Sequence, residues 1–365
     1  MGAFRGRVIA AMSGGVDSSV AACLLCEQGY EVTGLFMRTG VAEPEIDPGD
    51  APTCAPDRHR GCCSAADASD ARSVAGRLGI PFFALNFKDD FNRIIDYFAE
   101  EYGRGRTPNP CVVCNEHLKF GRLVDYGRAV GADFIATGHY AQIRAENGVY
   151  RLLRGADRLK DQSYVLFGIE REMLSRTLLP IGHLTKDQVR AEARRLGLPV
   201  SEKPDSVDIC FVPDRDYARV VRERRPESFV EGRVLDETGR EVGQHGGIAN
   251  FTVGQRQGLG IAMGKPYYVT RLDPGTNTVS IGPRESLSSG ELKASRVHWL
   301  MDSPSRPLRA CVQIRYAHRA APATVTPTGV DQVEVHFDQP QFAITPGQAA
   351  VFYDDNTVLG GGWID

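Results

Sequence analysis

The chain has 365 residues, of which 42% are hydrophobic and 24% are charged, and its formal net charge is −3. This length allows two or three domains with a sizeable core, and the small net charge means that any nucleic-acid partner must be met by a local basic patch. No apolar run approaches the roughly 20 residues that span a bilayer, and the N-terminus has no signal-peptide core, so we expect a cytoplasmic protein without membrane contact.

A glycine-rich turn joins the first predicted strand, residues 8–12, to the first predicted helix, residues 16–28. Glycines between a strand and a helix N-terminus aim backbone N–H groups and the positive end of the helix dipole at one point, which suits a phosphate. The turn (SGG, residues 13–15) lacks a Walker-A lysine and offers hydroxyls and amides instead. Two glycines can also make nothing more than a tight turn.

Strands and helices continue to alternate along the first half of the chain. Alternation of this kind predicts a doubly wound parallel α/β sheet, whose ligands lie at the C-terminal ends of the strands. Met37 and Gly138-His139 fall at such ends. Cys23 and Cys26 lie within the first helix and should be small buried apolar residues. Strands are predicted over residues 32–37, 81–87 and 133–137, and helices over residues 64–78, 89–102, 115–130 and 185–196.

A segment rich in proline, glycine and aspartate, residues 39–61, is typical of a surface loop. The nearby Cys54, Cys62 and Cys63, with His59 between them, invite a zinc interpretation, but their spacing matches no ligand pair well. Nine cysteines is an odd number, and a secreted disulfide scaffold is not expected.

Two later loops present cysteines. In TPNPCVVCN, residues 107–115, Cys114 meets the predicted start of a helix, where a thiol should have a lowered pKa and be a better nucleophile. In KPDSVDICF, residues 203–211, Cys210 follows a polar loop, although alone it could be a buried apolar thiol. Cys111-x-x-Cys114 also fits a redox pair or half of a metal site, and with Cys210 a three-thiolate iron–sulfur site is conceivable.

Beyond Pro213 the pattern changes to short alternating strands with turns. We therefore predict a catalytic domain over residues 1–212, a small β-rich central domain over residues 213–289 and a C-terminal β-barrel over residues 290–365. One barrel segment, residues 291–322, is locally basic and carries aromatic side chains, which suits RNA phosphates and bases, although a solvated charged face would look similar. Its basic residues are Lys293, Arg296, Arg306, Arg309, Arg315 and Arg319.

Eight motifs span nearly the whole chain in this order: SGGVDSS, TPNPCVVCN, KFG, ATGHYA, KDQSY, DSVDICF, FTVGQRQGLGIA and PGQAAVFY. Together they resemble the tRNA-specific 2-thiouridylases, and the first resembles the pyrophosphate loop of ATP pyrophosphatases. The resemblance implies an ATP-pyrophosphatase catalytic domain and ATP-dependent 2-thiolation of the wobble uridine in tRNAs for lysine, glutamate and glutamine. It also implies persulfide sulfur from a relay that starts with a cysteine desulfurase.

The resemblance assigns roles residue by residue. Cys114 matches the nucleophile and Cys210 the persulfide carrier, while Asp17 would help to hold Mg²⁺ against the leaving pyrophosphate. ATP contacts match Ala11, Met12, Ser13, Gly14, Gly15, Val16, Asp17, Ser18, Met37 and Gly138. The segment facing the target base matches Asn109, Pro110 and Cys111, and other tRNA contacts match His139, Lys160, Asp161, Gln162, Arg315, Tyr316 and Gln348.

Some members of this family have Asp where this chain has Cys111. An acid/base role for that carboxylate is therefore not carried over, and the extra thiol keeps an iron–sulfur-dependent thiolase that uses hydrosulfide as an alternative. Two further alternatives share only part of the motif set. Another ATP-pyrophosphatase ligase needs the first loop alone, and a non-catalytic iron–sulfur RNA-binding protein needs the cysteines alone.

Overall fold

The structure is a computed structural model that describes residues 4–40, 64–205, 209–261 and 264–365. Cys54, Cys62, Cys63 and His59, considered above for zinc, lie outside the described residues. A search of the described residues finds no helix that is long and apolar enough to cross a membrane. The chain divides into two units, residues 1–93 with 113–216 and residues 94–112 with 217–365, and each is described by itself.

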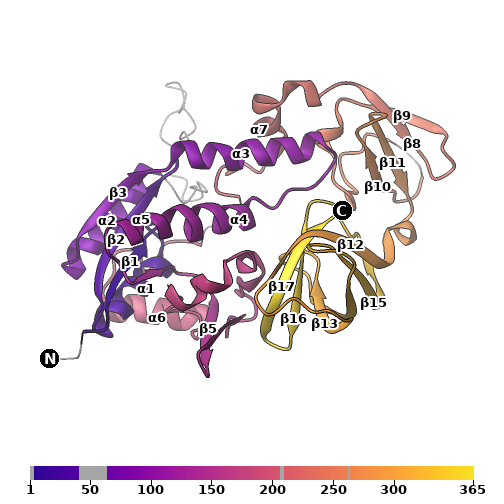
Figure 1. Ribbon diagram of the computed structural model, residues 1–365. Helices are drawn as coiled ribbons and strands as arrows, with labels where there is room; N and C mark the ends of the chain where they lie inside the picture. Colours follow the sequence, from indigo (N-terminus) through magenta and orange to yellow (C-terminus); the bar gives the residue numbers. More distant parts are fainter. Residues whose placement is uncertain (1–3, 41–63, 206–208, 262–263) are drawn as a thin grey trace, which may run out of the picture. The chain divides into compact units, whose positions relative to one another are not determined.

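The first unit is built on a five-stranded parallel sheet with the strand order β3-β2-β1-β4-β7, of which Figure 1 labels β1, β2 and β3. In the centre, Ala10 of β1 pairs with Gly34 of β2 and with Ala136 of β4. The predicted α/β fold class is confirmed, and β7 is an additional short strand. The strands are β1 (Arg7–Ala11), β2 (Glu31–Arg38), β3 (Phe82–Asn86), β4 (Phe134–Ala136) and β7 (Thr177–Leu178).

Local signals in the sequence explain where the helices of this unit begin and end. Ser64 caps α2 through a reciprocal capping box, and Gly79 ends it in the left-handed conformation at φ 65°. Cys23 is buried as predicted, and burial raises the pKa of its thiol to about 12, whereas Cys26 is half-buried. The helices are α1 (Val16–Glu27), α2 (Ala65–Leu78), α5 (Leu123–Ala129) and α6 (Lys186–Arg195), together with the start of α3 (Lys88–Gly103), whose later turns belong to the second unit. A hairpin of β5 (Ala141–Glu146) and β6 (Val149–Arg154) follows β4.

The helix around Cys114 begins earlier than the sequence suggested. It runs as α4 (Pro110–Val113), a π-helical stretch η1 (Cys114–Arg122) and then α5. Pro110 suits the first helical position because it lacks an N–H, and the Asn109 side chain accepts a hydrogen bond from the Val112 N–H at 3.3 Å. The expectation that Cys114 lies at the helix start is therefore wrong, because Cys111 lies in the first turn.

In the second unit, a four-stranded sheet with the order β10-β11-β8-β9 forms the predicted β-rich central domain. The helix α7 (Tyr217–Arg224) precedes this sheet. The sequence pattern beyond Pro213 predicts strands and does not predict this helix. The strands are β8 (Gly232–Leu235), β9 (Glu241–His245), β10 (Tyr268–Asp273) and β11 (Thr278–Gly282). Short 3-10 segments across the two units are η2 (Ser163–Leu166), η3 (Arg171–Arg176), η4 (Pro226–Ser228), η5 (Ile248–Asn250) and η6 (Arg284–Leu287).

The C-terminal strands form a closed barrel, as predicted. They are hydrogen-bonded in the order β12-β15-β14-β13-β16-β17, and antiparallel pairing between β12 and β17 closes the ring (Figure 1). Alternate side chains, such as Val312, Val325 and Val335, are fully buried inside it. The strands are β12 (Ser288–Trp299), β13 (Leu308–Gln313), β14 (Ala321–Pro327), β15 (Val333–Phe342), β16 (Ala349–Asp354) and β17 (Thr357–Ile364).

Candidate functional site

Three predicted nucleotide-binding segments meet at one edge of the parallel sheet. Ala11 ends β1, Met37 is next to last in β2, and Gly138 follows β4, and these three strands are neighbours. The hydroxyl of Thr39, just beyond β2, is buried without a hydrogen-bond partner among the described residues. An unsatisfied buried hydroxyl at this edge suits a ligand that offers polar groups, as a nucleotide does.

The backbone of the SGG turn can fold only with glycine at certain positions. Gly14 has φ +74°, and a Cβ added to it would overlap the backbone carbonyl of Asp67. At Gly138, an added Cβ would lie 2.7 Å from the Ser18 nitrogen, so the segment that follows β4 packs against the backbone of the first turn of α1. No side chain caps the N-terminus of α1, which leaves its first N–H groups directed at the same point. The geometry fits an anion such as pyrophosphate.

Asp17, in the first turn of α1, has two partners that are remote in the sequence. Both carboxylate oxygens accept hydrogen bonds from the Lys186 ammonium, at 2.8 and 2.9 Å, and one also accepts from the Tyr140 hydroxyl at 2.7 Å. Burial and the adjacent Asp17 charge raise the pKa of Tyr140, which keeps the phenol protonated as a donor. Sequence reasoning missed Lys186 because it lies 169 positions away and carries no motif signal.

A second lysine reaches the turn from the segment that leads to Cys210. The Lys203 ammonium donates to the Gly14 carbonyl at 2.9 Å and to the carboxylates of Asp67 and Asp70 at 2.6 Å each. Lys186 and Lys203 together place at the turn the positive charge that the SGG sequence itself lacks. The site is therefore assembled from residues more than 100 positions apart.

Asp205 lies two residues beyond Lys203 and collects three cations. Its carboxylate accepts from Lys186 at 2.8 Å, from Arg190 at 2.9 Å and from Lys160 at 2.7 Å. Desolvation opposes the charged form, but the hydrogen bonds and charges of Lys160 and Lys186 outweigh it and lower the pKa of Asp205 to about 2. The carboxylate is thus ionised throughout the neutral range.

Both predicted reactive cysteines lie in the first unit. Cys114 and Cys210 are half-buried thiols, whereas Cys111 is exposed. Phe211 anchors the position next to Cys210, because its buried ring packs edge-on against Phe91 with the ring centroids 5.8 Å apart. Within the described part of the chain, no three His, Cys, Asp or Glu side chains gather as a possible metal site.

Comparison with known proteins assigns the chain to a family. Residues 6–214 match the family described as the tRNA methyl transferase HUP domain, residues 219–283 the corresponding PRC-barrel domain, and residues 289–364 an aminomethyltransferase β-barrel domain. A tRNA-specific 2-thiouridylase MnmA from Carboxydothermus hydrogenoformans is 49% identical, over 99% of this chain and 98% of its own. Proteins of the same name from Symbiobacterium thermophilum and Clostridium perfringens are 48% and 45% identical, over 98% of this chain and 92% and 98% of theirs.

The chain belongs to the tRNA-specific 2-thiouridylase family. Several positions that match tRNA contacts of the family have partners inside this protein. His139 is buried between Thr137, whose hydroxyl lies 2.7 Å from Nδ1, and Lys119, whose ammonium lies 3.3 Å from Nε2. Because an ammonium can only donate, Nε2 accepts and Nδ1 carries the proton. Burial and the Lys119 charge hold the pKa of His139 well below 6.5, so its ring is neutral.

Two other positions of the thiouridylase motifs, Asp161 and Gln348, also form hydrogen bonds inside the protein. Asp161 accepts from Arg154, Gly155 and Ser163, so its oxygens organise the turn after β6. In the second unit, Gln348 donates to the carbonyls of Thr107 and Pro108 at 3.1 Å each. The PGQ motif of the barrel thereby holds the segment that leads to Asn109 and Pro110.

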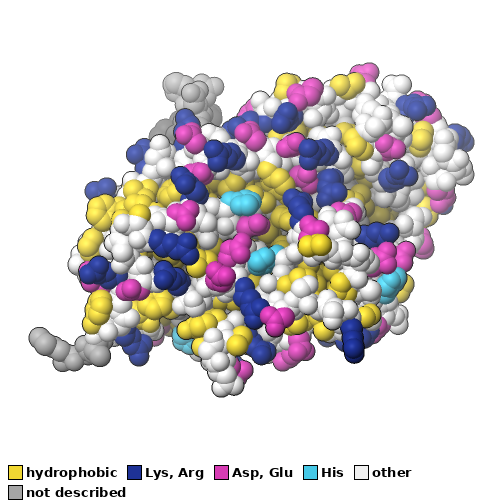
Figure 2. All heavy atoms as spheres, viewed as in Figure 1, with side chains coloured by type: hydrophobic (Ala, Val, Ile, Leu, Met, Phe, Trp, Pro, Cys, Tyr) yellow, Lys and Arg dark blue, Asp and Glu magenta, His cyan; other side chains and the backbone are white. Residues whose placement is uncertain are grey.

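The basic barrel segment is partly neutralised. Arg309 forms a bidentate pair with Asp338 at 2.7 and 2.8 Å, and Lys293 pairs with Glu334 at 3.2 Å. No ion pair of Arg315 or Arg319 occurs within the described residues, and the neighbouring Tyr316 is 46% exposed. On the face shown in Figure 2, basic and acidic side chains are interspersed, in keeping with the net charge of −3. The RNA interpretation therefore centres on the turn at residues 315–319.

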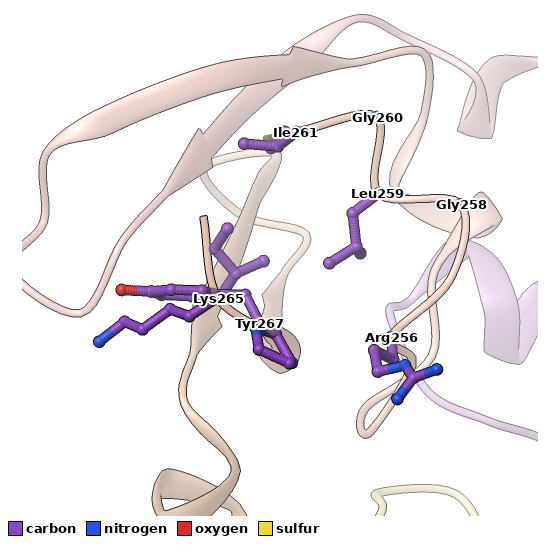
Figure 3. A pocket seen from close by; sticks show the side chains of 9 residues that line it. Arg256, Gly258, Leu259, Gly260, Ile261, Lys265 and Tyr267 are labelled. Carbon is purple, nitrogen blue, oxygen red and sulfur yellow. The ribbon is translucent and has the colours of Figure 1, made fainter. Parts of the chain in front are cut away.

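A pocket of about 500 Å³ in the central domain is lined in part by the FTVGQRQGLGIA motif, together with Lys265, Pro266, Tyr267 and Ile281. Figure 3 shows the Lys265 side chain beside the Tyr267 ring on one side and Arg256 on the other, with Leu259 between them. The Lys265 ammonium lies 5.3 Å from the centre of the Tyr267 ring, a cation–π arrangement.

Proposed function

We propose that this protein catalyses the ATP-dependent 2-thiolation of the wobble uridine in tRNAs for lysine, glutamate and glutamine. Its membership of the thiouridylase family supports this activity. The observation that carries the proposal is the bond from Lys203 to the Gly14 carbonyl, because it joins a residue seven positions before Cys210 to the pyrophosphate loop. We infer that activation by ATP and delivery of sulfur occur at one site.

The pyrophosphate loop would bind ATP at the C-terminal edge of the sheet. The C2 carbonyl of uridine is a poor electrophile, so the reaction requires its oxygen to be adenylated before sulfur can replace it. Ser13, Ser18 and the first N–H groups of α1, which has no side-chain cap, would stabilise the departing pyrophosphate. Mg²⁺ would neutralise the same phosphates, and the Asp17 carboxylate is the oxygen ligand that the loop offers.

The two thiols of the first unit would carry the sulfur. With a persulfide on Cys210, loaded by a relay that starts with a cysteine desulfurase, the terminal sulfur attacks C2 of the adenylated uridine and AMP leaves. The Cys114 thiolate then attacks the inner sulfur of Cys210, which forms a Cys114–Cys210 disulfide and frees the thiocarbonyl. Alternatively, Cys114 reduces the persulfide first, and the released hydrosulfide attacks C2.

Mass spectrometry of tRNA tests the activity directly. Unmodified glutamate tRNA is incubated with the protein, Mg²⁺, ATP and a sulfur donor, and digested nucleosides are analysed. We expect 2-thiouridine to appear only when ATP and the sulfur donor are both present, together with AMP and pyrophosphate. ATP cleavage without 2-thiouridine would instead favour another ATP-pyrophosphatase ligase.

Labelled sulfane sulfur separates the persulfide route from an iron–sulfur route. We expect the label to remain on Cys210 in Cys114→Ala, never to load in Cys210→Ala, and Cys111→Ala to keep substantial activity. A cluster held by all three cysteines predicts that each substitution abolishes bound iron and turnover alike. Complete loss of thiolation in folded Cys111→Ala under anaerobic conditions would contradict the persulfide assignment.

A further inference from the structure

Two chains of contacts lead from the pyrophosphate loop to the KDQ segment, residues 160–162. In the first, Asp17 accepts from Lys186 at 2.8 Å, Lys186 also contacts Asp205 at 2.8 Å, and Asp205 accepts from Lys160 at 2.7 Å. In the second, the Tyr140 hydroxyl donates to Asp17 at 2.7 Å, and the Tyr140 N–H donates to the Gln162 side chain at 2.9 Å. Asp17 is the common origin of both.

The two lysines in the first chain of contacts differ in how far their side chains are exposed. The Lys186 side chain is 11% exposed, whereas that of Lys160 is 41% exposed. Asp205 is shared, because its Oδ1 serves Lys186 and Arg190 while its Oδ2 serves Lys160. A buried ammonium must keep a carboxylate partner, whereas an exposed one can exchange its partner for a phosphate at little cost.

We propose that Asp17, Lys186, Asp205 and Lys160 couple nucleotide binding at the pyrophosphate loop to tRNA binding at the KDQ segment, so that each ligand tightens the other. This inference rests on the proposed function. The Asp17 oxygens that accept from Lys186 are the ones that a magnesium ion of the nucleotide would take. Lys186 then interacts more strongly with Asp205. This weakens the ion pair between Asp205 and Lys160 and makes the Lys160 ammonium available to an RNA phosphate.

Lys186 is thus a positioning residue that acts through Asp17 and Asp205. The protein also offers a matched control pair on α1 and α6, the helices that carry Asp17 and Lys186. Arg195 of α6 contacts Glu27 of α1 at 2.9 Å, and this exposed pair lies at the opposite end of α1 from Asp17. Losing that pair removes a cationic contact between α6 and α1 without touching the proposed coupling.

The test measures tRNA affinity with and without nucleotide. Fluorescence anisotropy of labelled, unmodified glutamate tRNA is recorded in Mg²⁺ buffer, with and without saturating α,β-methylene ATP, which cannot release pyrophosphate. In the wild type we expect the nucleotide to tighten tRNA binding about tenfold, and the tRNA to tighten nucleotide binding by the same factor. Lys186→Met should lower this ratio to about one, while Lys186→Arg should restore most of it and Arg195→Met should leave it unchanged.

Two results would overturn the inference: a wild-type ratio below about twofold, or a wild-type ratio that persists in folded Lys186→Met. Circular dichroism establishes that each variant is folded. If Lys186→Met fails to fold, the nearly isosteric Asp205→Asn replaces it, with the same expected loss and the same overturning result. Wild-type production of 2-thiouridine, assayed in parallel, keeps the proposed function separate, because coupling can fail in an enzyme that still thiolates tRNA.

Discussion

The pyrophosphate loop and the C-terminal barrel both contain many charged residues but arrange them differently. Around the loop, the Lys186 and Lys203 side chains are only 11% and 24% exposed, and three of their carboxylate partners, Asp17, Asp67 and Asp70, lie 133 to 169 positions away in the sequence. On the barrel, Arg309 and Asp338 are 61% and 48% exposed and only 29 positions apart. Water and salt screen an exposed pair, so it contributes little to stability, whereas breaking a buried pair leaves an uncompensated charge in a poorly solvated place. Substitutions should therefore act strongly near the loop and weakly on the barrel.

The largest effect is expected from Asp17→Ala. Thiolation should fall at least about 100-fold, because the loop loses its carboxylate ligand and Lys186 loses a counterion. Affinity for tRNA without nucleotide should not fall, and under the coupling proposed above it should rise towards the wild-type value with nucleotide, because Lys186 then pairs with Asp205 alone. The assays are 2-thiouridine formation and tRNA anisotropy, with Glu27→Ala at the other end of α1 as the control. Wild-type turnover in Asp17→Ala would remove Asp17 from the site.

A methyl group added at Gly138 should have the next largest effect. The new Cβ would lie 2.7 Å from the Ser18 nitrogen and 2.8 Å from the Asp17 carbonyl carbon, both backbone atoms that cannot rotate away. We expect Gly138→Ala to destabilise the protein by about 1–3 kcal/mol and to weaken ATP binding. In the barrel, Gly290 has nothing within 4 Å of an added Cβ, so Gly290→Ala should leave ATP binding unchanged in calorimetry. Equal effects of the two substitutions would contradict the contrast between the regions.

Within the barrel, Arg315→Ala and Arg309→Ala should differ. A phosphate contact releases counterions, so losing Arg315 should weaken tRNA binding and lower the salt slope by about 0.7–0.9. Arg309 is already bound to Asp338 through two hydrogen bonds, and its loss should change the slope less. Anisotropy titrations from low to moderate salt measure both. An unchanged slope in Arg315→Ala would assign that side chain a structural role.

The smallest expected effect is a pH dependence that arises from His139. Burial keeps its pKa well below 6.5 in the folded protein, so below pH 6.5 the unfolded chain binds more protons than the folded one. Its contribution to stability is complete above pH 6.5 and declines as the pH falls, by at most about 1.4 kcal/mol per pH unit. Urea unfolding between pH 7.5 and pH 5 should show a shallower decline in His139→Gln. A decline in His139→Gln as steep as in the wild type would contradict this assignment.

The sequence by itself determined the architecture, because the signals that specify it are local. Apolar runs of strand length, the capping residues Ser64 and Thr185 and the stop at Gly79 were sufficient for the α/β sheet, and short alternating strands indicated the barrel. The error in the predicted start of the helix at Cys114 also has a local cause. Asn109 and Pro110 form a good N-terminus, but the proline-rich TPNP sequence favoured an extended loop.

Only the tertiary structure decided which charges meet. Lys186, Lys203 and Tyr140 converge on Asp17 and Gly14 because the parallel sheet brings the C-terminal ends of distant strands together, and no periodicity in the sequence encodes such a meeting. Likewise, a count of basic residues between positions 291 and 322 could not tell that Arg309 is neutralised by a partner two strands away, whereas Arg315 lies in a turn. Charge pairing depends on distance in space, which the backbone topology sets after the local elements have formed.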